Sequence, residues 1–398
     1  MSRLKIGSAL LLVLPLAACD VLGTDAPQDA DLLDAPIDGI TPAQREAFAR
    51  GDQEFGRAFA PATGLGPLFN DVACIACHSG DGRGTPSNML QRYGSAGDGS
   101  GGPQLQTRAI PGAVPERVPD GVAISLRLPP PVFGVGLIEA IPESAILALA
   151  DPDDADGDGI SGRPNLVIPP AYVPATEPGG GAGPRLGRFG RKAQVTSLIE
   201  QTVEAYHQDM GITSPFRPHE NTNAETDPIT AATDVVLDPE VPASTVLAVV
   251  AYLRMLAPPA PGPDTPARAR GAQLFNDIGC AACHVPELRT GPGQIAALAN
   301  RDISLYSDLL LHDLGDELSD GRPDGDADGN EWRTTPLWGL RVARDFLDGA
   351  IYLMHDGRAQ TVEEAVELHG GEAEGVRERF GALSAEDRAA LLDFVETR

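Results

Sequence analysis

The sequence has little of the positive charge that a nucleic-acid-binding protein needs. Only 30 of its 398 residues are lysine or arginine, against 57 aspartate or glutamate, so the formal net charge is -27. Binding to phosphate backbones or to anionic lipid requires clustered positive charge, and this balance argues against both partners. An acidic surface suits a basic protein partner. A surface that is acidic only to keep the protein soluble is the alternative.

Long apolar runs are also missing. Beyond the first twenty residues, no uninterrupted apolar stretch reaches the roughly 18 residues needed to cross a bilayer. Glycine (45) and proline (36) are abundant, which predicts long loops. At roughly 150 residues per domain, the length is enough for two or three domains, each with its own core.

Cysteine is scarce, and its placement is informative. Four of the five cysteines form two C-x-x-C-H motifs, at residues 74–78 and 280–284, so none remains for a disulfide framework. In an exported protein this motif is typical of covalent haem attachment, in which the adjacent histidine binds the iron. A zinc site built from the four cysteines and a redox dithiol are alternatives. The predicted haem-binding residues are Cys74, Cys77, His78, Cys280, Cys283 and His284.

The N-terminus has the features of an export signal. Arg3 and Lys5 precede an apolar run over residues 6–16, and small residues then lead to Cys19. This arrangement resembles a bacterial lipoprotein signal, with residues 1–18 removed and Cys19 lipidated. We therefore expect a protein on the periplasmic side of a bacterial membrane, with the lipid as its only membrane contact. An ordinary signal peptide is the alternative.

The two motifs lie within a repeated frame. Residues 68–74 match residues 274–280, a Thr-Pro pair opens a helical segment before each, and an amphipathic segment closes each block. This pattern predicts a mainly α fold with two cytochrome c-like haem domains and long Gly/Pro-rich loops. The predicted boundaries are an acidic tether at 19–40, a first domain with insertions at 41–256, a Pro-rich linker at 257–264 and a second domain at 265–398.

Three segments in the second half, residues 309–315, 331–339 and 354–358, point to a family. Together with the two haem motifs, they resemble the di-haem oxidoreductase branch, sometimes labelled thiol-oxidoreductase-like, of the bacterial di-haem cytochrome c peroxidase superfamily. The resemblance covers roughly residues 40–398. It implies that the first haem binds peroxide, that the second receives electrons from a small donor protein such as a cytochrome c, and that His78 and His284 are the proximal ligands.

The resemblance also implies catalytic residues over the peroxide site. Gln201 falls on the position of the family's glutamine, and Asp209 comes nearest to its glutamate, where a carboxylate could move a proton. A solvated helix face is the alternative for both residues. The tryptophan that the peroxidases place between the haems is absent from residues 187–193, and Trp332 and Trp338 are expected near the second haem. Residues 315–331 lack the family's methionine ligand.

Other iron ligands are therefore needed. His312 and His355 lie in family-like motifs, so we expect each to be a distal ligand of the second haem or a partner beside it. Met210 is a weaker candidate at the first haem, since it could equally be core packing. His207, His219 and His369 are assigned no role.

An acidic loop matches the start of a calcium-binding motif. Asp154, Asp156 and Asp158 occupy positions 1, 3 and 5, and Gly159 occupies position 6, whereas Asn165 stands where the bidentate glutamate belongs. An exposed acidic turn is the alternative. A weaker copy begins at Asp324.

Two functions remain open at this stage. The first is a peroxidase-like oxidoreductase with two covalent haems, in which electrons pass from the C-terminal haem to a substrate site at the N-terminal haem. The second is a non-catalytic di-haem electron-transfer protein.

Overall fold

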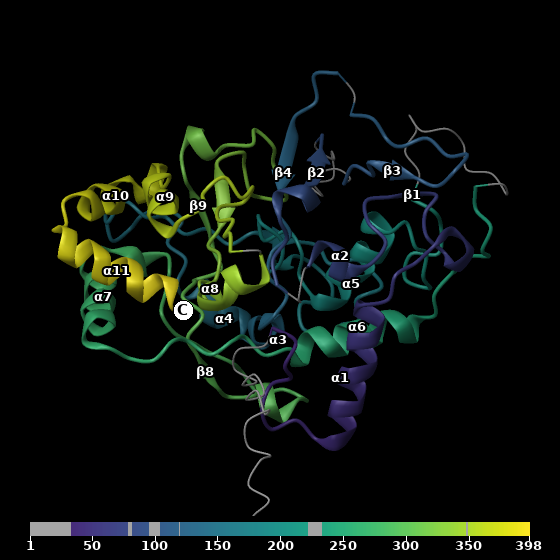
Figure 1. Ribbon diagram of the computed structural model, residues 1–398, viewed down its shortest axis with the longest axis horizontal. Helices are drawn as coiled ribbons and strands as arrows, with labels where there is room; N and C mark the ends of the chain where they lie inside the picture. The colour runs from purple at the N-terminus through teal and green to yellow at the C-terminus, as the bar shows by residue number, and fades with distance from the viewer. Residues whose placement is uncertain (1–32, 79–81, 95–103, 119, 222–232, 348) are drawn as a thin grey trace, which may run out of the picture.

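The computed structural model describes residues 33–78, 82–94, 104–118, 120–221, 233–347 and 349–398 (Figure 1). The predicted signal peptide, Cys19 and most of the tether lie outside these residues. The α-helices are α1 (Pro42–Phe55), α2 (Cys74–Cys77), α3 (Val135–Glu139), α4 (Glu143–Leu147), α5 (Leu198–Glu204), α6 (Ala243–Met255), α7 (Pro266–Asp277), α8 (Leu340–Ala343), α9 (Val362–Glu367), α10 (Glu374–Gly381) and α11 (Ala385–Glu396).

The strands pair only as short antiparallel ribbons. Each ribbon has two strands: β1 (Leu68–Phe69) with β3 (Arg108–Ala109), β2 (Leu90–Tyr93) with β4 (Ile124–Arg127), β5 (Leu166–Val167) with β6 (Arg185–Leu186), β7 (Leu288–Arg289) with β8 (Asp302–Ile303), and β9 (Leu311–Asp313) with β10 (Glu331–Arg333). In the last ribbon His312 lies opposite Trp332.

The predicted mainly α class is wrong. Helix accounts for 34% and strand for 11%, so neither dominates. The physical reason is the high content of glycine and proline, which end helices early and support turns. Helices α3 and α4, for example, have five residues each. In the described part of the chain, no helix is both long and apolar enough to cross a membrane.

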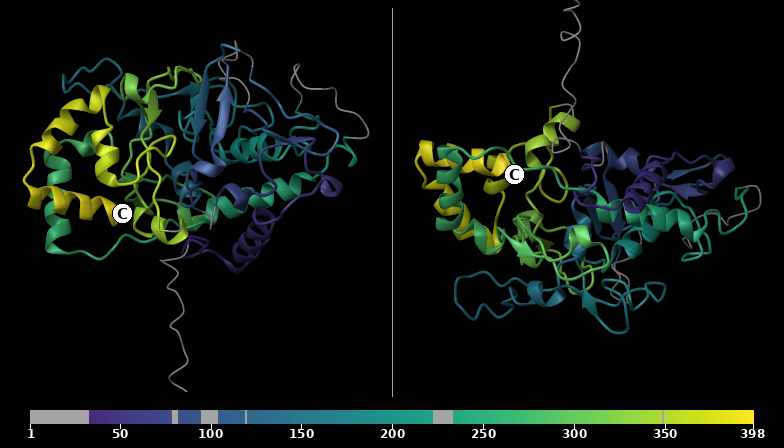
Figure 2. Two further views of the ribbon diagram at one scale, coloured as in Figure 1. Left: turned by 45° about the horizontal axis from the view of Figure 1, so that its top comes forward. Right: turned by 90° about the horizontal axis from the view of Figure 1, so that it is seen from below.

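Two pairs of helices pack closely together. Helix α1 packs on α6, and α7 packs on α11. Figures 1 and 2 show the yellow C-terminal helices gathered with α7 at one end, away from α1 and α6. In each pair a glycine permits the close approach. A Cβ on Gly51 would lie 2.5 Å from the Cβ of Tyr252, and one on Gly271 would lie 2.6 Å from the Cβ of Phe394.

The helix starts predicted from the Thr-Pro pairs are confirmed. The Thr41 side chain accepts a hydrogen bond from the backbone N–H of Gln44, and the Thr265 side chain accepts one from Arg268. The predicted start of the last helix is confirmed as well, because Ser384 accepts from Asp387. These caps satisfy N–H groups that have no partner within the helix.

The core consists of two main clusters of buried apolar side chains. The larger is built mostly from residues 33–256, with additions from residues 288–310 and from Trp338 and Val342. The smaller is built from α7, α11 and the segments between them. Each cluster surrounds one C-x-x-C-H motif, since Cys74 packs on the larger and Cys280 on the smaller.

Replacing Gly271 by alanine should destabilise the protein, because the new methyl group would collide with the carbonyl oxygen of Ala390 and with Phe394. We expect a loss of about 1–3 kcal/mol in the free energy of unfolding, typical of an overpacked contact. Denaturant titration measures it. Gly381→Ala is the matched control, because a Cβ at this helical glycine meets nothing within 4 Å. Equal effects of the two substitutions would contradict the close-approach explanation.

Candidate functional site

A large cavity surrounds the first C-x-x-C-H motif. It encloses about 1010 Å³, at the upper end of the roughly 300–1,000 Å³ usual for ligand pockets. The cavity brings together six residues proposed from the sequence, although some are far apart in the chain. They are Cys74, Cys77, His78, Gln201, Asp209 and Met210.

The His78 imidazole is oriented for metal binding. Its Nδ1 lies 3.3 Å from the carbonyl oxygen of Gly82, and a hydrogen bond donated there leaves the lone pair on Nε2. Burial lowers the pKa of His78 to about 4, so the ring is neutral near pH 7. The backbone of Pro130 interacts with the ring as well. A neutral imidazole is what an iron ligand requires.

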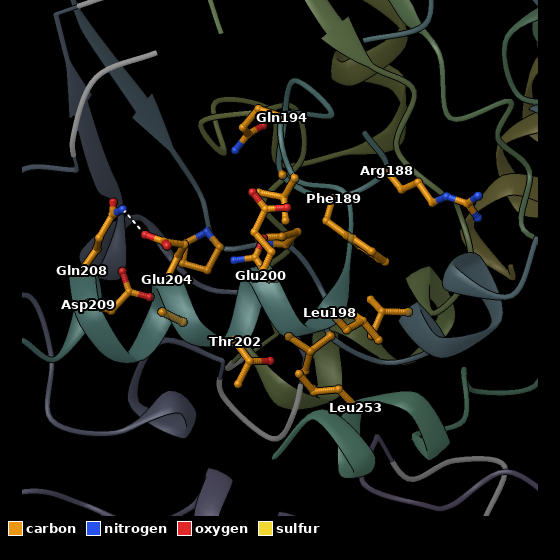
Figure 3. Close-up of a pocket in the computed structure, with 18 of the residues that line it drawn as sticks. Arg188, Phe189, Gln194, Leu198, Glu200, Thr202, Glu204, Gln208, Asp209 and Leu253 are labelled. Atoms are coloured by element: carbon orange, nitrogen blue, oxygen red, sulfur yellow. Dashed lines mark hydrogen bonds between the residues drawn. The ribbon is translucent and has the colours of Figure 1, made fainter. Parts of the chain in front are cut away.

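A row of polar side chains enters the cavity from α5 and the π-helical turn that follows it (Ala205–Asp209) (Figure 3). Glu204 accepts a hydrogen bond from Gln208 at 2.7 Å. One turn earlier, Glu200 accepts two hydrogen bonds from Thr196, at 2.9 Å from the backbone N–H and 2.8 Å from the hydroxyl. Glu200 was not predicted as a site residue from the sequence, although the spacing of Glu200, Glu204 and Gln208 places them on one helix face.

Two carboxyl groups in this cavity have raised pKa values. Burial raises the pKa of Glu200 to about 7, and it raises that of Asp209 to about 6 despite a hydrogen bond from Gln104. Groups that titrate near neutral pH are suited to proton transfer. The backbone of Asp209 also holds the segment just before the first C-x-x-C-H motif. Its carbonyl oxygen accepts hydrogen bonds from the backbone N–H groups of Asn70 (2.6 Å) and Asp71 (3.1 Å).

The second motif lines a smaller, more apolar cavity. It encloses about 200 Å³, so it would have to widen around a porphyrin. The Nδ1 of His284 lies 2.9 Å from the carbonyl oxygen of Tyr306, and burial lowers the pKa of His284 to about 4. This histidine therefore has the same orientation and charge state as His78. All four motif cysteines are free thiols, and burial raises their pKa values where a shift is resolved, at Cys77, Cys280 and Cys283.

His312 lines this cavity with both ring nitrogens occupied. Nε2 lies 2.8 Å from Asp308 and Nδ1 lies 2.9 Å from Glu372. Burial opposes a charge on the ring, but hydrogen bonds to Asp308, Cys283 and Glu372 raise the pKa of His312 to about 12. The geometry favours a charged partner beside the haem over an iron ligand.

His355 lies in the same cavity, stacked on Trp332. The ring centroids are 3.7 Å apart and the planes differ by 5°. The Nε2 of His355 lies 3.7 Å from an oxygen of Asp356, and burial lowers the pKa of His355 to about 4. Its role as a distal ligand or as a partner stays a prediction.

The two cavities share a wall. Arg333, Thr335 and Pro336 line both, with Trp332 on the side of the second cavity and Trp338 on the side of the first. The expectation that both tryptophans lie near the second haem therefore needs correction for Trp338. Residues 188–191 complete the wall, with Phe189 facing the first cavity and Arg191 the second. We call residues 188–191 and 333–336 the partition.

The partition is held by hydrogen bonds between its two segments. The backbone N–H of Arg333 donates to the carbonyl oxygen of Arg191 at 3.0 Å, and its Nε donates to that of Gly190 at 3.0 Å. Beside it, the buried Lys192 lies 2.8 Å from Asp320 and 4.4 Å from the centre of a Trp332 ring. Lys192 lies within residues 187–193, which lack the tryptophan that the resemblance would place there.

Buried arginines test whether a porphyrin suits the second cavity. Arg83, Arg191 and Arg333 line it and are each at most 8% exposed. Within the described residues, none of the three forms an ion pair with a carboxylate, and each donates to backbone carbonyls instead. Buried charges are normally paired, and the propionates of a porphyrin would supply the missing anions. Together with the thiols and the oriented histidine, these residues fit haem.

The acidic loop brings three carboxylates together. Ligand atoms of Asp151, Asp154 and Asp156 lie within 4.8 Å of one another. Asp158 is not among them, and its side chain accepts the N–H of Ile160 at 2.9 Å. In the weaker copy, the first aspartate forms ion pairs with arginines. The buried Asp324 carboxylate pairs with Arg127 and, at 2.9 Å, with Arg322.

Two cavities, each with an oriented histidine and paired thiols, define the class of di-haem redox proteins. The chain belongs to the family described as "Di-haem oxidoreductase, putative peroxidase", whose model matches residues 113–398. The family resemblance predicted from the sequence is thereby confirmed. The match includes the second C-x-x-C-H motif and begins after the first.

Comparisons with other proteins give weaker similarities. A Kuenenia stuttgartiensis hydrazine synthase structure is 15% identical over 99% of this chain and 100% of that chain, with a TM-score of 0.39. A MauG-like protein associated with microbial copper homeostasis is 17% identical over 67% of this chain and 87% of that one, with a TM-score of 0.30. No curated protein matches the sequence.

Replacing Glu200 by glutamine should change how stability depends on pH. Because the pKa of Glu200 is raised from 4.5 to about 7, the folded wild type keeps this proton after the unfolded chain has lost it. Wild-type stability therefore falls as the pH rises from 4.5 through 7, and the variant lacks this fall. At pH 8 we expect the variant to be more stable by about 2–3 kcal/mol.

Denaturant titration of both proteins at pH 4 and pH 8 measures the difference. Glu46→Gln, at an exposed position on α1, is the control and should leave the pH dependence unchanged. If the free energy of unfolding changes equally between pH 4 and pH 8 in the variant and the wild type, folding does not raise the pKa of Glu200, and the prediction fails.

Proposed function

We propose that this chain is an exported di-haem oxidoreductase with peroxidase-like activity, in which haem is attached covalently at each C-x-x-C-H motif. In this proposal electrons pass from the C-terminal haem to a peroxide site at the N-terminal haem. The observation that carries the proposal is the pair of cavities, one at each motif, separated only by the partition. Haem iron would supply the one-electron chemistry that no side chain of the chain offers.

The difference between the cavities supports the direction of electron flow. The first is five times larger and contains titratable carboxyl groups that can exchange protons with a substrate. The second has the apolar lining and small volume of a site that exchanges electrons only. Reduction of hydrogen peroxide to two waters takes two electrons and two protons, so the substrate site needs a proton source.

The side chains at the first cavity would handle those protons. Asp209, half-buried in the cavity that His78 also lines, would receive a proton from peroxide and return it to the leaving oxygen. Gln201 would orient the peroxide by hydrogen bonding. Glu200, with a pKa of about 7, would replenish the proton from within the cavity.

Partners and location follow from charge and from the N-terminal segment. The net charge of -27 favours a small basic electron donor, such as a cytochrome c. The signal-like residues 1–18 and Cys19 support a lipid-anchored protein on the periplasmic side. The carboxylates of Asp151, Asp154 and Asp156 support calcium binding, which calorimetry with the metal alone would test.

Covalent attachment is tested by removing one cysteine pair at a time. The exported wild type, made in a host that attaches haem c, should carry two haems, whereas Cys74→Ala/Cys77→Ala and Cys280→Ala/Cys283→Ala should each carry one. Mass spectrometry of the denatured proteins counts the haems. Glu46→Gln, at an exposed position on α1, is the control and should keep two. Four unmodified thiols in the wild type would overturn the proposal.

Peroxide chemistry is tested at the first cavity with the two-haem protein. Asp209→Asn and Gln201→Leu should each lower the rate of reaction with peroxide, by about 10²–10⁴-fold for the proton-transfer residue. Stopped-flow absorbance measures this rate, and Gln53→Ala, at an exposed position on α1, should leave it unchanged. Wild-type spectra indifferent to peroxide would instead identify a protein that only transfers electrons.

A further inference from the structure

The second cavity contains more histidines than a haem needs. His284, His312, His355 and His369 all line it. One of them, His284, belongs to the C-x-x-C-H motif and is the proximal ligand in the proposed function. The other three histidines are candidates for a second ligand of the iron.

Two of the histidines are committed elsewhere. His312 has a carboxylate oxygen within 2.9 Å of each ring nitrogen, so iron would have to displace an ion pair. The His355 ring lies flat on Trp332 with Nε2 toward Asp356, so turning that nitrogen to iron would break the stack.

His369 has the arrangement of a ligand. It follows α9, and its Nδ1 lies 2.6 Å from the carbonyl oxygen of Ala365 in that helix. A hydrogen bond donated there fixes the ring and leaves the lone pair on Nε2. The two motif histidines are held in the same way, by Gly82 and Tyr306. Among the described residues, no hydrogen bond to the Nε2 of His369 is found.

His369 and His284 line the same cavity of about 200 Å³. Val366 and Phe380, which also line it, are apolar and offer no ligand atom. Met354 is the remaining rival, because its thioether lines the cavity too.

We propose that His369 is the sixth ligand of the second haem iron, giving that haem two histidine ligands. The proposal rests on haem being bound at Cys280 and Cys283, as in the proposed function. It explains why the electron-receiving site can lack the methionine of the peroxidases. Two histidines would give the iron a lower reduction potential than a histidine and a methionine.

The test uses the full-length exported protein with both haems attached. Ferric wild type, His369→Gly and Met354→Leu are compared by electron paramagnetic resonance and visible spectroscopy, with and without added imidazole, after the haems are counted. We expect one low-spin haem with two nitrogen ligands in the wild type. His369→Gly should convert one haem equivalent to high spin, and imidazole should restore it, whereas Met354→Leu should resemble the wild type.

The outcomes separate the alternatives. A low-spin signal that survives in His369→Gly, or that is lost in Met354→Leu, would overturn the assignment while leaving the proposed function intact. If His369→Gly fails to fold, His369→Met serves instead. That variant should stay low-spin with a raised reduction potential, and an unchanged potential would overturn the assignment. A wild type without covalent haem would remove the proposed function and this assignment together.

Discussion

The hydrogen bonds between Arg333 and the turn at Gly190 and Arg191 set the geometry on which the rest of the site depends. They join two segments more than 140 residues apart in sequence, and these segments are the wall common to both cavities. If this contact were absent, the two C-x-x-C-H motifs would belong to separate pockets with no fixed relation. The wall is formed by the end of β10, the loop after it and the turn at Gly190 and Arg191. Arg333, Thr335 and Pro336 each line both cavities.

Three buried arginines line the second cavity, and two of them belong to the partition. A chain with a net charge of -27 places Arg83, Arg191 and Arg333 in a buried position without carboxylate partners among the described residues. Leaving such charges unpaired is costly. A porphyrin with two propionates would compensate them, so the cofactor would stabilise the folded chain as well as supply its chemistry.

The family and the helix caps could be predicted because their signals are local. The threonine and serine caps and the family segments are each contained in a few residues. The predicted fold class was wrong because apolar periodicity identifies only the long helices α1, α6, α7 and α11. It carries no information about the loops between them, which make up most of the chain. The engagement of His312 could not be predicted, since Glu372 reaches it from 60 residues away. Glu200 was missed for a different reason: its face of α5 is recognisable, but only the structure shows that the face borders the cavity of His78.

The two halves show how one frame yields two different sites. In each half two helices pack closely at a glycine, Gly51 against Tyr252 and Gly271 against Phe394. In each half the motif histidine also lies within hydrogen-bond distance of a backbone carbonyl oxygen. The segments between motif and closing helix differ. In the first half α5 and the turn after it bring carboxyl groups to a large cavity, whereas in the second half β9, β10 and α9 close a small cavity with histidines and apolar side chains. The frame repeats the geometry of the motif histidine, and the segments inserted into it determine the size and the lining of each cavity.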